Sequence, residues 1–345
     1  MSEAAALLDE VLTPLAADLA DPTIEDVAVN GPGGWWARTA QGWTYHLYPD
    51  LDADTLEGIA ILAGSLRKQN VGRANPLCGG ELHTGHRFQV VLPPAVPAGT
   101  VSLTFRRPSD SVSPLSALPE RYSTARWNQW QDRTQNRRHD SAGLLDLYDG
   151  GDLVAFLRAI VRTKRTPLLA GATGAGKTFL SKSLLAEADP AARVVTIEDA
   201  MEMVVRQPNA VRLLFAAGGD SGVTPADCLH AALRMRPDLI PVQELREPAS
   251  AWVYLNEIAT GHPGSPTTIH GETAPQAMRR LFALLKASPE GSSIGDDVLL
   301  GMMGAAIDLV IPISAEGGTR QLGEVWFADD AARRGETVAD LLRAA

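Results

Sequence analysis

The sequence predicts an α/β protein of two domains: an N-terminal mixed α/β domain and a C-terminal domain with a mainly parallel sheet. With 345 residues, the chain is long enough for two domains of ordinary size. Apolar residues make up 45% of it and charged residues 21%, which is typical of a globular protein and excludes a mainly disordered chain. From about residue 141, helical and strand patterns alternate. Repeated βα units of this kind favour a parallel sheet with helices on both faces.

The chain is acidic, with 31 Lys and Arg against 41 Asp and Glu and a formal net charge of −10. We therefore expect no strong general binding to nucleic acids, although a local basic patch stays open. Cys78 and Cys228 are too few for a disulfide scaffold or a four-cysteine zinc site, and they fit a reducing cytoplasm. No secretory signal or apolar run long enough to span a membrane is visible, so we expect a cytoplasmic protein with at most peripheral membrane contact.

Residues 1–107 are predicted to form the N-terminal domain. The first 20 residues carry apolar side chains at three- and four-residue steps, which is typical of an amphipathic helix. Apolar spacing predicts a second helix, and alternating polarity or turn residues predict strands. The expected helix covers 55–69, and the expected strands cover 27–29, 35–38, 43–48, 86–92 and 100–105. The last two strands should pair around the turn at 93–99.

Residues 108–140 differ in composition from what precedes and follows them. Three prolines, Pro108, Pro114 and Pro119, lead into a polar, basic stretch that contains Trp127 and Trp130. We interpret the segment as a linker between the domains with an inserted basic helix. Two interpretations stay open: a solvated surface segment, or a patch for acidic lipid headgroups or a partner protein.

Residues 141–345 are predicted to form the C-terminal domain. The expected helices cover 152–162, 177–187, 225–235, 249–259, 274–287 and 296–306. The expected strands cover 167–170, 193–197, 239–245, 266–270, 309–313 and 323–327. Thr224 is placed to cap the third of these helices, and Gly261 to stop the fourth.

Between the strand at 167–170 and the helix at 177–187 stands a G-x-x-x-x-G-K-[S/T] motif: Gly171, Ala172, Thr173, Gly174, Ala175, Gly176, Lys177 and Thr178. Its glycines let successive backbone N–H groups point into one concavity, and the helix adds the positive end of its dipole. Lys177 is expected to reach the β- and γ-phosphates, and the Thr178 hydroxyl to hold Mg²⁺. The motif therefore predicts a phosphate-binding loop.

Carboxylates end two other predicted strands. Glu198 and Asp199 follow one strand, and Glu244 lies near the end of another. The carboxyl ends of parallel strands line the ligand crevice, where acids can hold Mg²⁺ through water and orient an attacking water. Glu198 and Glu244 are therefore candidate catalytic and metal-binding residues, although acids in such places are often only solvated.

Two histidines, His262 and His270, stand eight residues apart with Gly and Pro between them, which is a poor metal-binding pattern. One of them can be a structural residue. Near a nucleotide, His270 could hydrogen-bond a phosphate or a catalytic glutamate.

Four sequence blocks in this order resemble those of the secretion ATPase superfamily: GATGAGKT, TIEDAMEMV, LRMRPDLIPVQELRE and TGHPGSPTTIHG. The resemblance is closest to the hexameric traffic ATPases of type IV secretion and conjugation, and it extends to GHRFQVVLPP and GTVSLTFRRPS in the N-terminal domain. It implies a RecA-like P-loop domain that hydrolyses ATP with Mg²⁺ to drive substrate translocation or pilus assembly. It also implies a homohexamer, contacts with inner-membrane components of the secretion channel, and a peripheral position at the inner membrane.

The resemblance also implies roles for single residues. Glu198 matches a glutamate that is often assigned as the general base of the family. Glu244 matches a glutamate that polarises water or supports Mg²⁺, and His270 matches a histidine that acts as a sensor. In the family, an arginine of the N-domain approaches the nucleotide, and the resemblance assigns this position to Arg106 or Arg107. The implied cofactor site also includes Phe179, which directly follows the motif. Further candidates for phosphate sensing between subunits are Arg234 and Arg236.

The chain departs from the family pattern at Ala175, Phe179, Pro241 and Gln243. Phe179 replaces a second hydroxyl residue, and Pro241 lacks a ladder donor, which favours an edge or the end of a strand. Two alternative functions stay open. The arginine cluster at 121–138 favours a nucleic-acid-dependent ring NTPase, whereas Pro241 and Gln243 favour a nucleotide-gated assembly protein with little hydrolysis.

Overall fold

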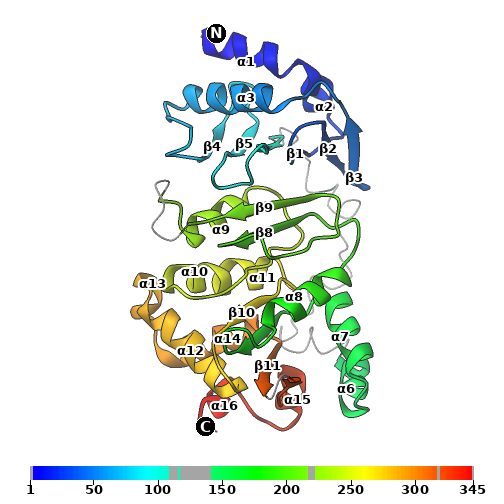
Figure 1. Cartoon of the computed structure of the whole chain (residues 1–345), viewed down its shortest axis with the longest axis vertical. Helices are drawn as coiled ribbons and strands as arrows, with labels where there is room; N and C mark the ends of the chain where they lie inside the picture. The colour runs from blue at the N-terminus through cyan, green and yellow to red at the C-terminus, as the bar shows by residue number, and fades with distance from the viewer. Residues whose placement is uncertain (1–2, 109–115, 117–140, 217–221, 317–318, 344–345) are drawn as a thin grey trace.

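The computed structural model describes residues 3–108, 116, 141–216, 222–316 and 319–343, which form two domains stacked along the long axis of the molecule (Figure 1). The basic helix expected in the linker lies outside the described residues. Within the described ranges, no helix combines the length and apolar character needed to cross a membrane. Cys78 and Cys228 are both buried and form no disulfide.

The N-terminal domain is a six-stranded antiparallel sheet in the order β3-β2-β1-β6-β5-β4. Its strands are β1 Asp26–Val29, β2 Gly34–Thr39, β3 Gly42–Leu47, β4 Leu77–Glu81, β5 Arg87–Val91 and β6 Ser102–Arg106. Its helices are α1 Glu3–Val11, a 3₁₀ turn Thr13–Leu15, α2 Ala16–Ala20 and α3 Ala53–Leu66. The predicted pairing of β5 with β6 is confirmed. Strand β4 was not predicted, because Gly79 and Gly80 interrupt its apolar pattern.

The C-terminal domain carries a mainly parallel sheet, as predicted. Strands β10, β7 and β11 run parallel, β8 and β9 form a second parallel pair, and β12 and β13 are antiparallel to β11. The strands are β7 Pro167–Gly171, β8 Val194–Glu198, β9 Ala210–Leu214, β10 Thr267–Ile269, β11 Leu309–Glu316, β12 Thr319–Leu322 and β13 Trp326–Phe327.

Helices cover both faces of this sheet (Figure 1). Within β7, Leu168 packs in the core under α9, α10, α12 and α14, whereas Leu169 packs in the core under α6, α7 and α8. The helices are α6 Ser141–Asp149, α7 Leu153–Arg162, α8 Lys177–Ala186, α9 Pro225–Leu233, α10 Pro248–Val253, a π-helix Tyr254–Ile258, α11 Ala259–Gly261, α12 Ala274–Ala287, α13 Pro289–Ser292, α14 Asp296–Ala306, α15 Ala328–Arg333 and α16 Val338–Arg343. Thr224 caps α9 in a capping box with Asp227, as predicted for the N-cap.

The strand expected at 239–245 is present only as single parallel bridges. Leu239 bridges β8, and Val242 bridges both β8 and β10, so this segment lies between two strands of the sheet. Of the two positions expected for Pro241, a sheet edge or the end of a strand, the bridges on both sides exclude the sheet edge. Pro241 has no N–H to donate, which interrupts the ladder, but its carbonyl still accepts the Ile197 N–H at 3.0 Å.

The two domains meet at a packed interface that is partly polar. Ala95, in the loop between β5 and β6, is buried in the C-domain core, and its carbonyl accepts the Leu214 N–H at 2.8 Å. Arg193 is fully buried beside β8 and donates to Asn30 Oδ1 at 2.8 Å, while its guanidinium lies over the Trp43 ring. Burial lowers the pKa of Arg193 to about 10. The junction thus fixes how the N-domain sits on β8 and β9.

Candidate functional site

The phosphate-binding loop joins β7 to α8, in the strand–loop–helix order that the motif predicts. At Gly171, a Cβ would come within 2.5 Å of the Ile313 carbonyl oxygen, so the close approach of β7 to β11 requires glycine there. Gly176 is the N-cap of α8 and has a φ of +110°, a conformation that L side chains rarely adopt. The backbone of this loop therefore requires glycine at both positions.

Lys177 folds back onto the loop that precedes it. Its Nζ donates to the carbonyl oxygens of Gly171 at 2.7 Å and Ala172 at 3.1 Å. The same Nζ lies 3.9 Å from Glu244 Oε1. Burial lowers the pKa of Lys177, and the Glu244 carboxylate opposes that shift. Phosphate oxygens would have to replace these carbonyl oxygens for the lysine to hold a nucleotide.

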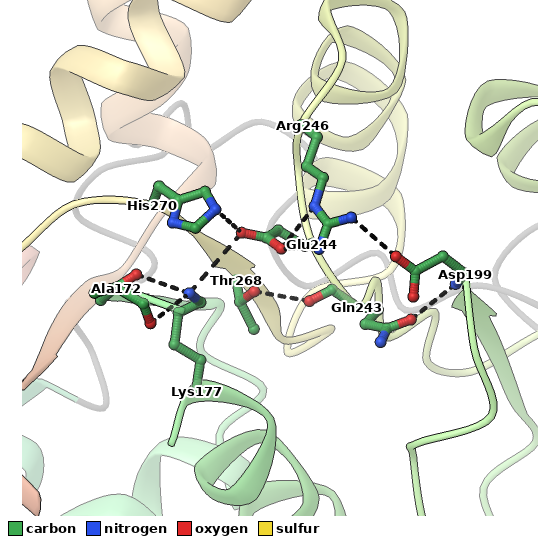
Figure 2. A network of polar contacts seen from close by, with 9 residues as sticks. Ala172, Lys177, Asp199, Gln243, Glu244, Arg246, Thr268 and His270 are labelled. Carbon is green, nitrogen blue, oxygen red and sulfur yellow. Dashed lines mark hydrogen bonds and ion pairs between the residues drawn. The ribbon is translucent and has the colours of Figure 1, made fainter. Parts of the chain in front are cut away.

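Glu244 is the centre of a cluster of basic side chains (Figure 2). Its Oε2 accepts from Arg246 Nε at 2.8 Å and lies 2.6 Å from Arg246 Nη2. Its Oε1 lies 3.1 Å from His270 Nε2 and faces Lys177. The structure thus brings together Lys177, Glu244 and His270, three of the residues that the sequence predicts. Arg246 was missed, although a residue two positions along an extended segment shares the face of Glu244.

Arg246 and Gln243 tie this cluster to the end of β8 (Figure 2). Arg246 Nη1 donates to Asp199 Oδ2 at 2.9 Å. The Asp199 N–H donates to Gln243 Oε1 at 2.8 Å, and Thr268 Oγ1 donates to the Gln243 carbonyl at 2.8 Å. The carboxyl ends of β8, β10 and the segment between them are therefore crosslinked by side chains.

Glu198 does not join this cluster in the structure. Its side chain is fully buried, and Arg212 donates to both carboxylate oxygens, from Nε at 3.1 Å and Nη2 at 3.2 Å. Thr196 Oγ1 and the backbone N–H groups of Glu202 and Met203 donate to the same carboxylate at 2.7 to 2.9 Å. Protein donors therefore occupy both oxygens of Glu198, and its expected roles as general base and metal ligand stay predictions.

The two arginines of the FRRPS block have different surroundings. Arg107 donates to the backbone carbonyls of Ile24 at 3.3 Å and Leu19 at 2.5 Å, so it holds the N-domain together. Arg106 is largely exposed at a cavity of 420 Å³ between the two domains. Four more arginines line the cavity: Arg67, Arg87, Arg234 and Arg236. No residue of the phosphate-binding loop lines it.

His262 has a structural environment, in contrast to His270. Its N–H donates to the Ile258 carbonyl at 2.7 Å, and its own carbonyl accepts from Ser265 Oγ at 2.7 Å. Burial lowers the pKa of His262, and the nearby Arg236 acts in the same direction. Of the two histidines, His270 is the one that the structure places at Glu244.

The residues near the loop fit a cation held mainly by phosphate oxygens and water. Among the described residues, no cluster of three or more His, Cys, Asp or Glu side chains could hold a metal ion alone. Glu244 Oε1 is buried and has no well-aligned hydrogen-bond donor, although His270 is close. With the Thr178 hydroxyl, this oxygen supplies the hard donors that Mg²⁺ prefers.

A larger cavity of 610 Å³ lies at the opposite end of the sheet. It is lined by Trp43 and by residues at the starts of strands, among them Pro167, Leu239 and Pro266. Ligands of open α/β sheets bind at the carboxyl ends of the strands, so this cavity is not the nucleotide site.

The chain is similar to known proteins over nearly its whole length. Residues 141–311 match the family described as "Type II/IV secretion system protein". The chain is 48% identical over 334 residues to Protein VirB11 of Rhizobium radiobacter, covering 96% of this chain and 97% of that protein. It is 35% identical over 336 residues to the type IV secretion system protein VirB11 of Bartonella quintana, with 94% of each chain covered. The crystal structure of the VirB11 ATPase from the Brucella suis type IV secretion system, in complex with sulphate, matches with a TM-score of 0.88 at 30% identity, covering 96% of this chain and 97% of that chain.

Proposed function

The chain belongs to the VirB11 family of type IV secretion ATPases, and from this premise we propose that it is a ring motor that converts ATP turnover into domain motion. The motion drives substrate translocation or pilus assembly. The observation that carries the proposal is the convergence of Lys177, Glu244 and His270 at the phosphate-binding loop. The family membership favours this role over a nucleic-acid-dependent NTPase.

In the proposed reaction, the triphosphate binds to the N–H groups of the loop, and Lys177 exchanges the carbonyls of Gly171 and Ala172 for phosphate oxygens. Glu244 orients the attacking water, which adds to the γ-phosphorus as the bond to the β–γ bridging oxygen breaks. His270 contacts Glu244 and so responds to its state. When bound, Mg²⁺ would neutralise phosphate charge, and Thr178 and Glu244 are the residues that would hold it.

We further propose that the ring is a homohexamer. The cavity that contains Arg106, Arg234 and Arg236 has no loop residue of its own chain, so these arginines would serve a nucleotide on a neighbouring copy. Arg193 and the Ala95 loop would transmit the movement between the domains, since they join the N-domain to β8 and β9. The partners would be inner-membrane components of the secretion channel, with the ring peripheral at that membrane.

Mass measurement of the purified chain, with and without ATP and Mg²⁺, tests the assembly, and phosphate release tests the turnover. We expect a hexamer and steady hydrolysis. Lys177→Ala should lower the rate at least 100-fold, because its cation contacts the transferred phosphate. Lys182→Ala, five residues further along α8, is the matched control. Undiminished phosphate release by Lys177→Ala would refute the proposal, as would hydrolysis that depends on added DNA.

The nucleotide-gated alternative has one observation in its favour. Gln243 and Arg246 restrain Glu244 and Asp199 in this conformation, and restraint of this kind could slow hydrolysis. Turnover of the unmodified chain well above that of Glu244→Gln would exclude it.

A further inference from the structure

Beside the phosphate-binding loop, an arginine covers an exposed aromatic ring. Phe179 directly follows Thr178, the last residue of the motif, and is 64% exposed, which is unusual for a large apolar side chain. Arg320 Cζ lies 5.9 Å from the centre of its ring. In a nucleotide site, such an arginine–phenylalanine pair would offer a flat, polarisable face next to the bound phosphates.

The fold brings Arg320 to this place from far along the chain. Strand β11 runs parallel to β7, with Ile313 opposite Gly171, so the end of β11 reaches the loop. Strand β12 returns antiparallel to β11, with Arg320 opposite Ala315. Arg320 then lies across Gly176, where an added Cβ would come within 2.9 Å of its Cδ. Gly176 therefore also provides the space through which Arg320 reaches Phe179.

The guanidinium of Arg320 is available for a ligand. Arg320 is exposed, and within the described ranges no carboxylate pairs with it. Its guanidinium lies over the Phe179 ring, and its Cδ and Nε pass beside Gly176. Guanidinium groups stack on flat π-systems, and aromatic side chains stack on nucleobases of any sequence.

We propose that Phe179 and Arg320 form the nucleobase site, in which the Arg320 guanidinium moves off the Phe179 ring and the base of the bound nucleotide stacks between the two. The inference rests on the proposed nucleotide binding at Lys177, which places the phosphates at the first turn of α8, where Phe179 also lies. Because stacking grows with the area of the π-system, the site favours purine over pyrimidine nucleotides.

Isothermal titration calorimetry of the full chain uses two ligands, a non-cleavable ATP analogue and inorganic tripolyphosphate. Comparing the two affinities separates the contribution of the base from that of the phosphates. Phe179→Ala should weaken binding of the ATP analogue by about 5- to 150-fold, the range that loss of one base stack gives. It should leave tripolyphosphate binding unchanged. Phe179→Tyr, which keeps the ring, should retain the affinity for the ATP analogue.

Arg320→Ala and Lys177→Ala complete the test. Arg320→Ala should follow Phe179→Ala, with a loss confined to the ATP analogue. Equal losses for both ligands in Arg320→Ala would place its guanidinium on phosphate and overturn the inference, as would unchanged binding of the ATP analogue in Phe179→Ala. Lys177→Ala should weaken both ligands. If it weakens neither, the failure is that of the phosphate site and not of the base site.

Discussion

Two carboxylates at the same end of the parallel sheet have opposite surroundings. Glu198 is fully buried and accepts from a hydroxyl, two backbone N–H groups and both arms of Arg212. Glu244 contacts Arg246 and His270, whose side chains are 58% and 46% exposed, and it faces the Lys177 ammonium. Two acids at the ends of neighbouring strands thus differ in how firmly the protein holds them. Whether its partners can be displaced by a ligand matters as well.

The difference has an energetic basis. Removing one partner of a buried ion pair leaves an uncompensated charge and costs about 3–5 kcal/mol, so the Glu198 network stabilises the fold and resists rearrangement. Partners that reach water lose little on moving, because solvent screens exposed pairs. The Arg246 and His270 side chains can therefore turn away from Glu244 when a nucleotide enters. If the proposed function is right, we expect the Glu198 region to support the site and the Glu244 region to rearrange when a nucleotide binds.

The largest expected effect that tests the comparison of Glu198 with Glu244 is the loss of stability when Arg212 is substituted. Arg212→Met should lower the free energy of unfolding by about 3 kcal/mol, because it leaves the Glu198 carboxylate buried without its counter-ion. Urea unfolding followed by circular dichroism measures this. Arg206→Met, an exposed arginine before β9, is the control and should change stability by less than about 0.5 kcal/mol. Equal effects of the two substitutions would mean that the hydrogen bonds and ion pair of Glu198 contribute no more to the free energy of unfolding than an exposed arginine does.

A smaller effect is expected on turnover, at Arg246. Arg246→Gln should lower kcat about 10-fold and change KM little, because the arginine positions Glu244 and does not reach the substrate. Steady-state phosphate release gives both constants, and Arg246→Lys should recover part of the loss through its remaining charge. A change in KM alone would show that Arg246 binds the nucleotide directly.

The smallest effect is expected at Gln243. Gln243→Ala removes the acceptor of the Asp199 N–H and should cost about 1 kcal/mol of stability, the usual worth of one hydrogen bond. Turnover should stay within about threefold of the unmodified chain. A large increase in kcat would instead mean that this bond restrains hydrolysis, in support of the nucleotide-gated alternative.

Much of the fold was predictable, because local signals decide it. The ranges of α12 and α14 follow from apolar spacing, and the Thr224 cap and the phosphate-binding loop follow from short motifs. Strands β4 and β9 were not predicted. Glycines interrupt β4, and β9 is a five-residue strand with Arg212 at its centre.

The site was predictable only in part, for a related reason. Glu244, Lys177 and His270 meet because the ends of parallel strands converge, which a sequence can reveal. The environment of Glu198 depends on Arg212, which lies in a strand that the sequence did not predict. Arg320 reaches the loop through the pairing of β12 with β11, and no local pattern indicates that pairing. Arg212 and Arg320 thus arrive through tertiary pairing, which sequence reasoning did not predict.

The most direct test compares Glu244→Gln with Glu198→Gln, measuring kcat and the free energy of unfolding for both. Glu244→Gln should lower kcat about 100-fold and leave stability within about 1 kcal/mol of the unmodified chain. Glu198→Gln should lower stability by about 3 kcal/mol while the folded fraction keeps kcat within about threefold. If Glu198→Gln stays as stable as the unmodified chain and loses turnover, Glu198 is the catalytic carboxylate and the division between the two regions is wrong.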